Sequence, residues 1–167
     1  MSGEVRAAVI TVSDRSAAGE RQDAGGPVAV AALREAGFAC GEQCIVPDGE
    51  DSVEAALREA IGTGARVIVT TGGTGVGPRD LTPEGTKRVL DREVPGIAEE
   101  LRRMGAAALP AGMLSRGLSG ISAGALIVNL PGSPSAVREG VPVVLSVARH
   151  VVSQIDGGDH QLAGEHL

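Results

Sequence analysis

Along the chain, short runs of apolar residues alternate with segments in which apolar residues recur every three or four positions. The run at 5–12 is almost continuously apolar, with only Arg6 and Thr11 as polar interruptions, which is typical of a strand buried on both faces of a parallel sheet. The segment 66–71, with Val67, Ile68 and Val69 at its centre, and the segment 125–130 predict further strands. A less regular run at 38–46 predicts a further strand. Residues 115–123, which are rich in Gly and Ser and lack a helical period, predict a short hairpin.

The segments with the helical period also carry start and stop signals. The first has Pro27 at its first position and ends before Gly37, because Pro suits the start of a helix and Gly its end. The second is expected to open with a capping box formed by Asp51 and Glu54. In the third, Thr82 is expected to be the N-cap, with a proline directly after it. The apolar stripes consist of Ala29, Ala32, Leu33 and Ala36; Val53, Ala56, Leu57, Ala60 and Ile61; Ile97, Leu101, Met104 and Ala108; and Val144, Val147, Ala148, Val151, Val152 and Ile155.

The alternation of strands and helices predicts an α/β fold with three layers, in which helices cover both faces of a mainly parallel sheet. A chain of 167 residues fits one domain with its own core. We place this domain at residues 1–157. Residues 158–167 show no periodicity and are expected to form a disordered C-terminal tail.

Charge and aromatic content exclude the usual nucleic-acid-binding surfaces. The formal net charge is −6, whereas proteins that bind nucleic acid gather Lys and Arg against its phosphates. Phe38 is the only aromatic residue, so bases cannot stack on a row of aromatic rings. Any phosphate must therefore be met by local backbone and side-chain donors.

The sequence also predicts where the protein resides. The N-terminus shows no secretory signal, and the longest apolar stretch, 141–155, contains Pro and Arg and is too short to span a bilayer. Cys40 and Cys44 on one strand would lie roughly 13 Å apart, too far for a disulfide. We therefore expect a protein of the reducing cytoplasm, with neither a membrane nor a nucleic acid as partner.

Polar or glycine-rich loops follow the predicted strands, beginning at Ser13, Pro47, Thr71 and Pro131. In open α/β sheets, ligands bind beyond the carboxyl ends of the strands. We therefore expect these loops to meet at one edge of the sheet and to form a single site.

The loop 71–80 has glycines at positions 72, 73, 75 and 77, whose missing side chains let backbone N–H groups approach a phosphate or a planar ring. It lacks the Gly-Lys-Ser/Thr ending of a P-loop, and Pro78 stands where a dinucleotide fingerprint needs its third glycine. The simplest alternative is that the glycines only turn the chain between a strand and a helix. Thr74, Arg79 and Asp80 are more polar than such a turn requires.

Asp48 and Asp80 are expected at the same sheet edge, where two carboxylates suit Mg²⁺ bridged to substrate phosphates. A cation together with Arg79 or Arg116 would stabilise charge at a transferring phosphorus. Each Asp could equally be a solvated loop residue or a helix cap, and Arg116 a solvent-facing side chain. The histidines lie on the last helix and in the tail, so a nucleophile–base pair is not expected.

A series of short motifs is distributed along most of the chain. They are Thr11-Val12-Ser13-Asp14-Arg15, Asp23-Ala24-Gly25, Val46-Pro47-Asp48, Thr70-Thr71-Gly72-Gly73-Thr74-Gly75, Pro78-Arg79-Asp80-Leu81-Thr82-Pro83-Glu84, Ser115-Arg116 and Asn129-Leu130-Pro131-Gly132-Ser133-Pro134. In this order they resemble the molybdopterin-binding domain of the Mog, MoaB and gephyrin family. The resemblance runs from about residue 5 to residue 155.

This resemblance implies Mg²⁺-dependent transfer of AMP from ATP to the terminal phosphate of molybdopterin, with release of pyrophosphate. It implies that Asp48 and Asp80 are catalytic and metal-binding residues. The residues expected to bind nucleotide and substrate are Ser13, Asp14, Thr71, Gly72, Gly73, Thr74, Gly75, Arg79, Ser115, Arg116, Pro131, Gly132 and Ser133. A homotrimer or hexamer, and hand-over of the product to a molybdate-inserting enzyme, are implied as well.

Two other functions stay open on these grounds. A MoaB-type protein could bind molybdopterin without adenylylating it, since a fold does not fix an activity. A scaffold for partner proteins would carry a long exposed apolar patch outside the pocket. The presence of both Asp48 and Asp80 favours the enzyme.

Overall fold

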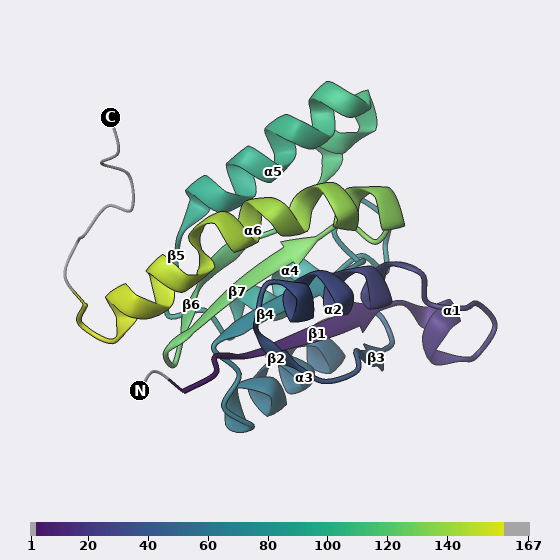
Figure 1. Cartoon of the computed structure of the whole chain (residues 1–167). Coiled ribbons are helices and arrows are strands. Elements are labelled where there is room, and N and C mark those ends of the chain that lie inside the picture. The colour runs from purple at the N-terminus through teal and green to yellow at the C-terminus, as the bar shows by residue number, and fades with distance from the viewer. Residues whose placement is uncertain (1–2, 159–167) are drawn as a thin grey trace.

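The computed structural model describes residues 3–158 and is built around a seven-stranded sheet (Figure 1). The strand order is β2-β1-β4-β7-β6-β5, and β3 pairs with the later part of β1. Pairings among β1, β2, β3, β4 and β7 are parallel, whereas β6 runs antiparallel to both β5 and β7. The strands are β1 (Arg6–Val12), β2 (Ala39–Cys40), β3 (Cys44–Val46), β4 (Val67–Thr71), β5 (Arg92–Glu93), β6 (Ser119–Ser122) and β7 (Ala125–Leu130).

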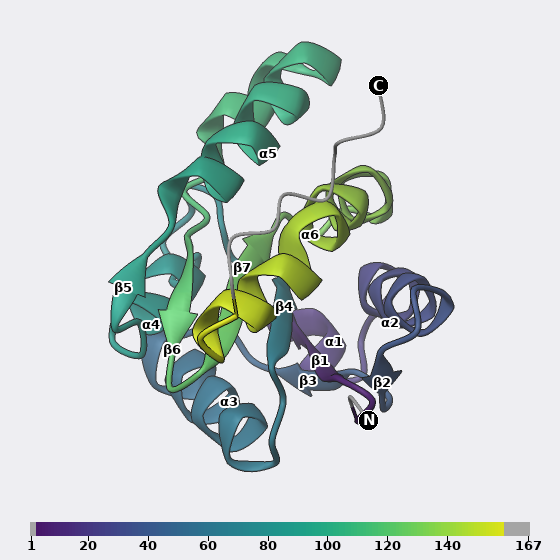
Figure 2. The ribbon, with the colours of Figure 1, turned by 60° about the vertical axis from the view of Figure 1, so that its left-hand side comes forward.

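Helices cover both faces of this sheet, as the two views in Figures 1 and 2 show. The helices are α1 (Asp14–Ala17), α2 (Gly25–Glu35), α3 (Glu50–Gly62), α4 (Thr82–Lys87), α5 (Pro95–Ala108), the 3-10 helix η1 (Pro110–Leu114) and α6 (Pro134–Ile155). Buried residues of α2, α5 and α6 pack on one face, and those of α3 pack on the other. The three-layer, mainly parallel α/β fold expected from the sequence is confirmed.

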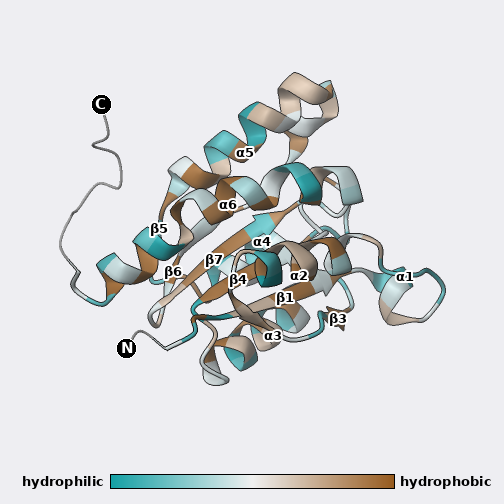
Figure 3. Ribbon diagram, viewed as in Figure 1, coloured by the Kyte–Doolittle hydropathy of each residue, from teal (hydrophilic) through white to brown (hydrophobic). Residues whose placement is uncertain are grey.

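The hydrophobic core has two parts, one on each face of the sheet, which explains why the central strands are mainly apolar. Along β1, Ala7 and Val9 face the α2–α6 side, whereas Ala8, Ile10 and Val12 face α3. β4 and β7 alternate in the same way, so both faces of each central strand are buried. Figure 3 shows these strands as the apolar centre of the molecule.

Several local expectations need correction. The segment 38–46 forms two short strands, β2 and β3, instead of one. The N-cap of α3 is Gly49, at a φ of 136°, with no side-chain cap, so the capping box of Asp51 and Glu54 is wrong. Glu54 instead accepts hydrogen bonds from Arg58 and from Arg88. The Glu54 side chain therefore bonds to an arginine of the same helix and to one from α4's C-terminal end, and does not cap the helix start.

The start of α4 also differs from the expectation. Its N-cap is Leu81, and Thr82 is the first helical residue. The Thr82 hydroxyl donates to the Gly72 carbonyl at 2.9 Å, so it connects the helix to the loop 71–80, called the glycine loop below. The segment 115–123, expected to form a hairpin by itself, contains only one strand, β6. The hairpin pairs β6 with β7, which lies outside that segment, through a turn at Ala123 and Gly124.

Beyond α6, Gly158 is the last described residue, and its N–H donates to the Ser153 carbonyl at 2.8 Å. The rest of the expected tail lies outside the described residues. Within residues 3–158, no helix combines the length and apolarity needed to cross a bilayer.

Candidate active site

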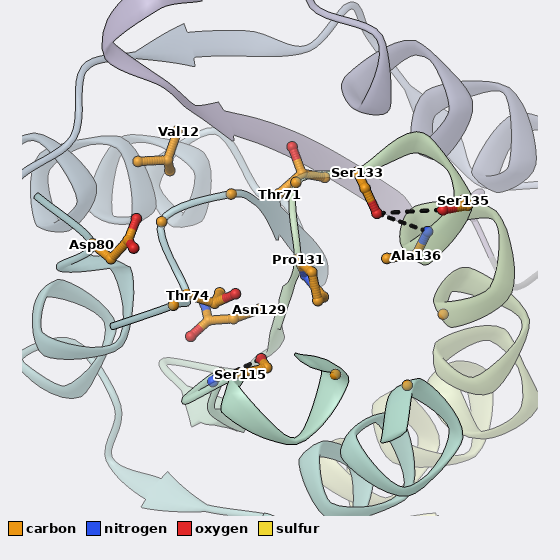
Figure 4. Close-up of a pocket in the computed structure, with 18 of the residues that line it drawn as sticks. Val12, Thr71, Thr74, Asp80, Ser115, Asn129, Pro131, Ser133, Ser135 and Ala136 are labelled. Atoms are coloured by element: carbon orange, nitrogen blue, oxygen red, sulfur yellow. Dashed lines mark hydrogen bonds between the residues drawn. The ribbon is translucent and has the colours of Figure 1, made fainter. Parts of the chain in front are cut away.

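A pocket of about 790 Å³ lies at the carboxyl ends of β1, β4 and β7, within the usual size range of small-molecule sites. It brings together most of the expected site residues, and Figure 4 shows part of this arrangement. Asp80 and Thr74 lie on one side, with Ser133 and Ser135 on the other. Of the expected residues, those that line the pocket are Ser13, Asp48, Thr71, Gly72, Gly73, Thr74, Gly75, Asp80, Ser115, Pro131, Gly132 and Ser133.

The first part of the glycine loop is held close to its neighbours. Gly72 and Gly73 have φ values of 93° and 68°, which side chains other than Gly rarely adopt. A Cβ on Gly72 would clash with the Val12 carbonyl, and one on Gly73 would clash with the Thr82 hydroxyl. The Gly72 N–H donates to the Leu130 carbonyl at 3.0 Å. The glycines are therefore needed for close packing at the strand ends.

After Gly72 the loop presents backbone donors that the protein does not use. Within the described residues, the N–H groups of Gly73, Thr74 and Gly75 donate to no protein acceptor. All three residues line the pocket. Consecutive free N–H groups form a concave site suited to an anion such as a phosphate. The loop therefore offers more than a turn between strand and helix.

A second set of donors comes from the start of α6, a helix of 22 residues. Ser133 is its N-cap, and its hydroxyl accepts a hydrogen bond from the Ala136 N–H at 3.2 Å (Figure 4). A helix N-terminus carries partial positive charge and favours a negatively charged ligand. A Cβ on Gly132 would lie 3.1 Å from the Gly72 Cα, so the two donor groups are direct neighbours.

Asp48 and Asp80 bring two carboxylates to the same wall. Asp48 Oδ2 accepts from the Asp14 N–H at 3.0 Å, and Asp80 Oδ2 accepts from the Gly77 N–H at 2.9 Å. Partial burial, followed by the nearby charges of Asp14 and Asp80, raises the pKa of Asp48. A bound cation would relieve this repulsion.

The donor set partly fits a divalent cation. In the part of the chain that the structure describes, Oδ1 of Asp48 and Oδ1 of Asp80 accept no hydrogen bond, and no group of three or more His, Cys, Asp or Glu residues could hold a metal. Two carboxylates without further protein ligands match Mg²⁺, which commonly binds to one or two carboxylates, water and substrate phosphates. The residues therefore fit Mg²⁺ only together with a phosphate ligand.

Asp14 and Arg79 lie beside the pocket but do not line it. Arg79 donates from Nε and Nη2 to the two carboxylate oxygens of Asp14, both at 3.0 Å. This bidentate contact lowers the pKa of Asp14. Arg79 Nη2 also donates to the Asp48 carbonyl at 2.9 Å. The structure thus joins these expected ligand-binding residues to one another.

Arg116 is likewise directed at the protein. Its guanidinium donates to the Gly75 carbonyl at 2.8 Å and to the Asp80 carbonyl at 2.6 Å, and it forms an ion pair with Glu84. Its backbone N–H donates to the Thr74 carbonyl at 2.8 Å. These bonds hold the loop 74–80 at both ends, while the preceding Ser115 lines the pocket.

Other pocket residues were not singled out from the sequence. Arg21 lies in the loop between α1 and α2, where no periodicity marks it, and it has no hydrogen bond or ion pair among the described residues. Arg102, on α5, also lines the pocket and donates to the Gly117 carbonyl at 2.8 Å. Asn129, which belongs to one of the sequence motifs, also lines the pocket. The remaining wall is apolar and comes from Leu101, Met104, Ala108, Leu109 and Leu114.

The fold and the pocket have the features of an α/β protein that binds phosphorylated small molecules at the carboxyl edge of its sheet. The family described as "Probable molybdopterin binding domain" matches residues 8–150. Because that match covers most of the chain, the protein belongs to this molybdopterin-binding family of molybdenum cofactor biosynthesis. The family resemblance read from the motifs is confirmed.

Individual relatives agree with this assignment. The chain is 38% identical over 143 residues to the molybdopterin adenylyltransferase of Haemophilus influenzae, covering 83% of this chain and 72% of that protein. It is 36% identical over 155 residues to the molybdenum cofactor biosynthesis bifunctional protein of Chlorobaculum tepidum, covering 93% of this chain. It spans only 50% of the length of that bifunctional relative.

Solved structures show the same fold. The Mog protein of Mycobacterium ulcerans is 42% identical, with a TM-score of 0.86, over 90% of this chain and 99% of that one. The MoaB protein of Thermus thermophilus is also 42% identical, with a TM-score of 0.84, over 92% and 97% of the two chains.

Proposed function

We propose that the protein is a molybdopterin adenylyltransferase, which transfers AMP from ATP to the terminal phosphate of molybdopterin and releases pyrophosphate. A phosphate oxygen of molybdopterin attacks the α-phosphorus of ATP, and the bond between the α-phosphorus and its bridging oxygen to the β-phosphate breaks. The observation that carries this proposal is the row of free N–H groups at Gly73, Thr74 and Gly75 beside the carboxylates of Asp48 and Asp80. Two relatives named molybdopterin adenylyltransferase support it, one from Haemophilus influenzae and one from Escherichia coli, of which the alignment covers 72% and 77%.

Different residues contribute to different parts of phosphoryl transfer, in which positioning and electrostatics account for most of the catalysis. The loop N–H groups and the start of α6 bind phosphate oxygens. Asp48 and Asp80 would hold Mg²⁺ through Oδ1, and the ion would neutralise charge on the phosphates and the leaving pyrophosphate. Arg21 and Arg102 add positive charge around the pocket. The apolar wall from α5 and η1 would cover a planar ring, which suits a purine or a pterin.

The test is release of pyrophosphate from Mg-ATP with and without molybdopterin. We expect release only when molybdopterin and Mg²⁺ are both present. Asp80→Asn keeps the shape of the side chain and its contact with the Gly77 N–H, but removes the charge. We expect it to lower kcat by about a hundredfold or more. Unchanged turnover in Asp80→Asn would remove that residue from the proposed role.

The same assay separates the enzyme from a binding protein of the MoaB type. Tight binding of molybdopterin without any adenylylated product would favour the binding protein. The family resemblance further supports a cytoplasmic homotrimer or hexamer that hands its product to a molybdate-inserting enzyme, which we include in the proposal. Light scattering on the purified protein tests the subunit number.

A further inference from the structure

We propose that Asp14 and Arg79 form a positioning pair that orients the Asp48 carboxylate, and that neither side chain binds the substrate. The proposal rests on the adenylyl-transfer function proposed above. It changes the role of two residues that the motifs placed among the ligands.

The pair belongs to a closed set of hydrogen bonds between Asp14 and Asp48. The Asp14 N–H donates to Asp48 Oδ2 at 3.0 Å, and the Asp48 N–H donates to Asp14 Oδ1 at 3.1 Å. Each carboxylate is thus held by the backbone of the other residue. Asp14 follows β1 and Asp48 follows β3, so these bonds continue the pairing of the two strands into the site.

Arg79, in the glycine loop, completes this set of hydrogen bonds. Its guanidinium contacts both oxygens of Asp14 at 3.0 Å and the Asp48 carbonyl at 2.9 Å. A bidentate contact between Arg and a carboxylate fixes orientation as well as distance. Arg79 therefore connects the glycine loop to both strand ends.

The result is a defined direction for the Asp48 carboxylate. Since Oδ2 is bound to the Asp14 N–H, Oδ1 is left to face the glycine loop, where a Cβ on Gly73 would lie only 3.1 Å away. Oδ1 accepts no hydrogen bond among the described residues. An oxygen held in this way, without a protein donor, is suited to a cation and substrate. Residues that hold a metal ligand from behind typically change affinity or activity by roughly ten- to a hundredfold when replaced.

The experiment uses the full chain and compares Asp14→Ala, Arg79→Ala and the double variant. Arg103→Ala is the matched control, because Arg103 makes a similar bidentate contact with Glu100 on α5, also partly exposed, and does not line the pocket. We measure kcat and the KM for ATP in the pyrophosphate assay. Thermal unfolding checks that each variant is folded.

We expect each single variant to lose roughly ten- to a hundredfold in kcat, with the KM for ATP changed less than about twofold. The double variant should lose no more than the worse single variant, because both residues act through one set of bonds. Arg79→Lys should recover little, since an ammonium cannot form the two parallel contacts. A large rise in KM at constant kcat for Arg79→Ala would instead make Arg79 a phosphate ligand. Losses that multiply in the double variant would also overturn the proposal.

A second measurement does not depend on turnover. Amide hydrogen exchange, followed by NMR, reports on the N–H groups of Asp14 and Asp48 directly. We expect Arg79→Ala to speed exchange at both amides by about tenfold, because loss of the charged contacts makes local opening easier, and Arg103→Ala to leave both unchanged. Unchanged exchange in Arg79→Ala would overturn the positioning role even in an active enzyme. If the wild type released no pyrophosphate, the proposed function would fail, and the exchange result would still decide the role of Arg79.

Discussion

Gly73→Ala tests whether the glycine loop needs close packing or only a flexible turn. The substitution places a Cβ where φ is 68° and where the Thr82 hydroxyl already lies. The left-handed conformation costs about 1–2 kcal/mol for Ala. Displacing the Thr82 hydroxyl from the Gly72 carbonyl, now 2.9 Å away, costs about 1 kcal/mol more. We therefore expect a loss of roughly 2–3 kcal/mol in the free energy of unfolding.

Gly19→Ala is the matched control. Gly19 has a φ of 74°, and a Cβ there would meet no heavy atom within 4 Å. The free energy of unfolding should therefore fall only by the conformational cost, roughly 1–2 kcal/mol. In a protein of this size, 1 kcal/mol changes the Tm by about 2–4 °C. Thermal unfolding should show Gly73→Ala melting several degrees below Gly19→Ala.

The same pair separates an effect on activity from an effect on stability. The new Cβ of Gly73→Ala would lie 3.1 Å from Asp48 Oδ1, so the carboxylate must shift by a few tenths of an ångström. We expect kcat to fall by about tenfold or more, whereas Gly19→Ala should retain wild-type turnover. Equal Tm values for the two variants, together with equal turnover, would refute the reasoning.

Three further predictions address the pocket and its support. Asn129→Ala should destabilise the protein by about 2–4 kcal/mol in urea unfolding, because the buried amide bonds two threonine hydroxyls and one backbone N–H. Glu84→Gln should destabilise the protein at pH 7. The contact with Arg116 lowers the pKa of Glu84 from its ordinary value of 4.5. The contact therefore stabilises the protein fully above pH 4.5, and this stabilisation is lost as the pH falls through the lowered pKa. The stability curves of wild type and variant should converge in acid. Arg21→Ala should raise the KM of a phosphorylated substrate by about fivefold, as expected for loss of about 1 kcal/mol, and leave the Tm unchanged, because Arg21 bonds to no described residue.

The layered fold could be read from the sequence because it depends on local periodicity. Mainly apolar runs predicted β1, β4 and β7, and the apolar stripes predicted the buried faces of the long helices. The short strands β2, β3 and β5 depend on pairing with a neighbour. Their own composition therefore carries little signal, and the pattern of 38–46 predicts a single strand where the structure has two.

The position of the pocket was also largely predictable. Parallel strands place their carboxyl ends at one edge, so loops far apart in sequence were expected to meet there. Asp48, Asp80, residues 71–76 of the glycine loop and residues 131–133 do line one pocket. Arg21 and Arg102 were missed, because an Arg in a polar loop or on a helix looks like any solvent-facing side chain.

The sequence alone determined most of the strands and helices and the edge of the sheet at which the candidate site lies, since both follow from residue pattern and chain direction. Only the tertiary structure decided what each charged side chain contacts. Arg79 reaches Asp14 across 65 positions, and Arg116 reaches the Gly75 carbonyl across 41. A long guanidinium can take a carboxylate, a carbonyl or a ligand as its partner. Its partner is set by the distances between loops once the sheet has formed, and no local pattern encodes those distances.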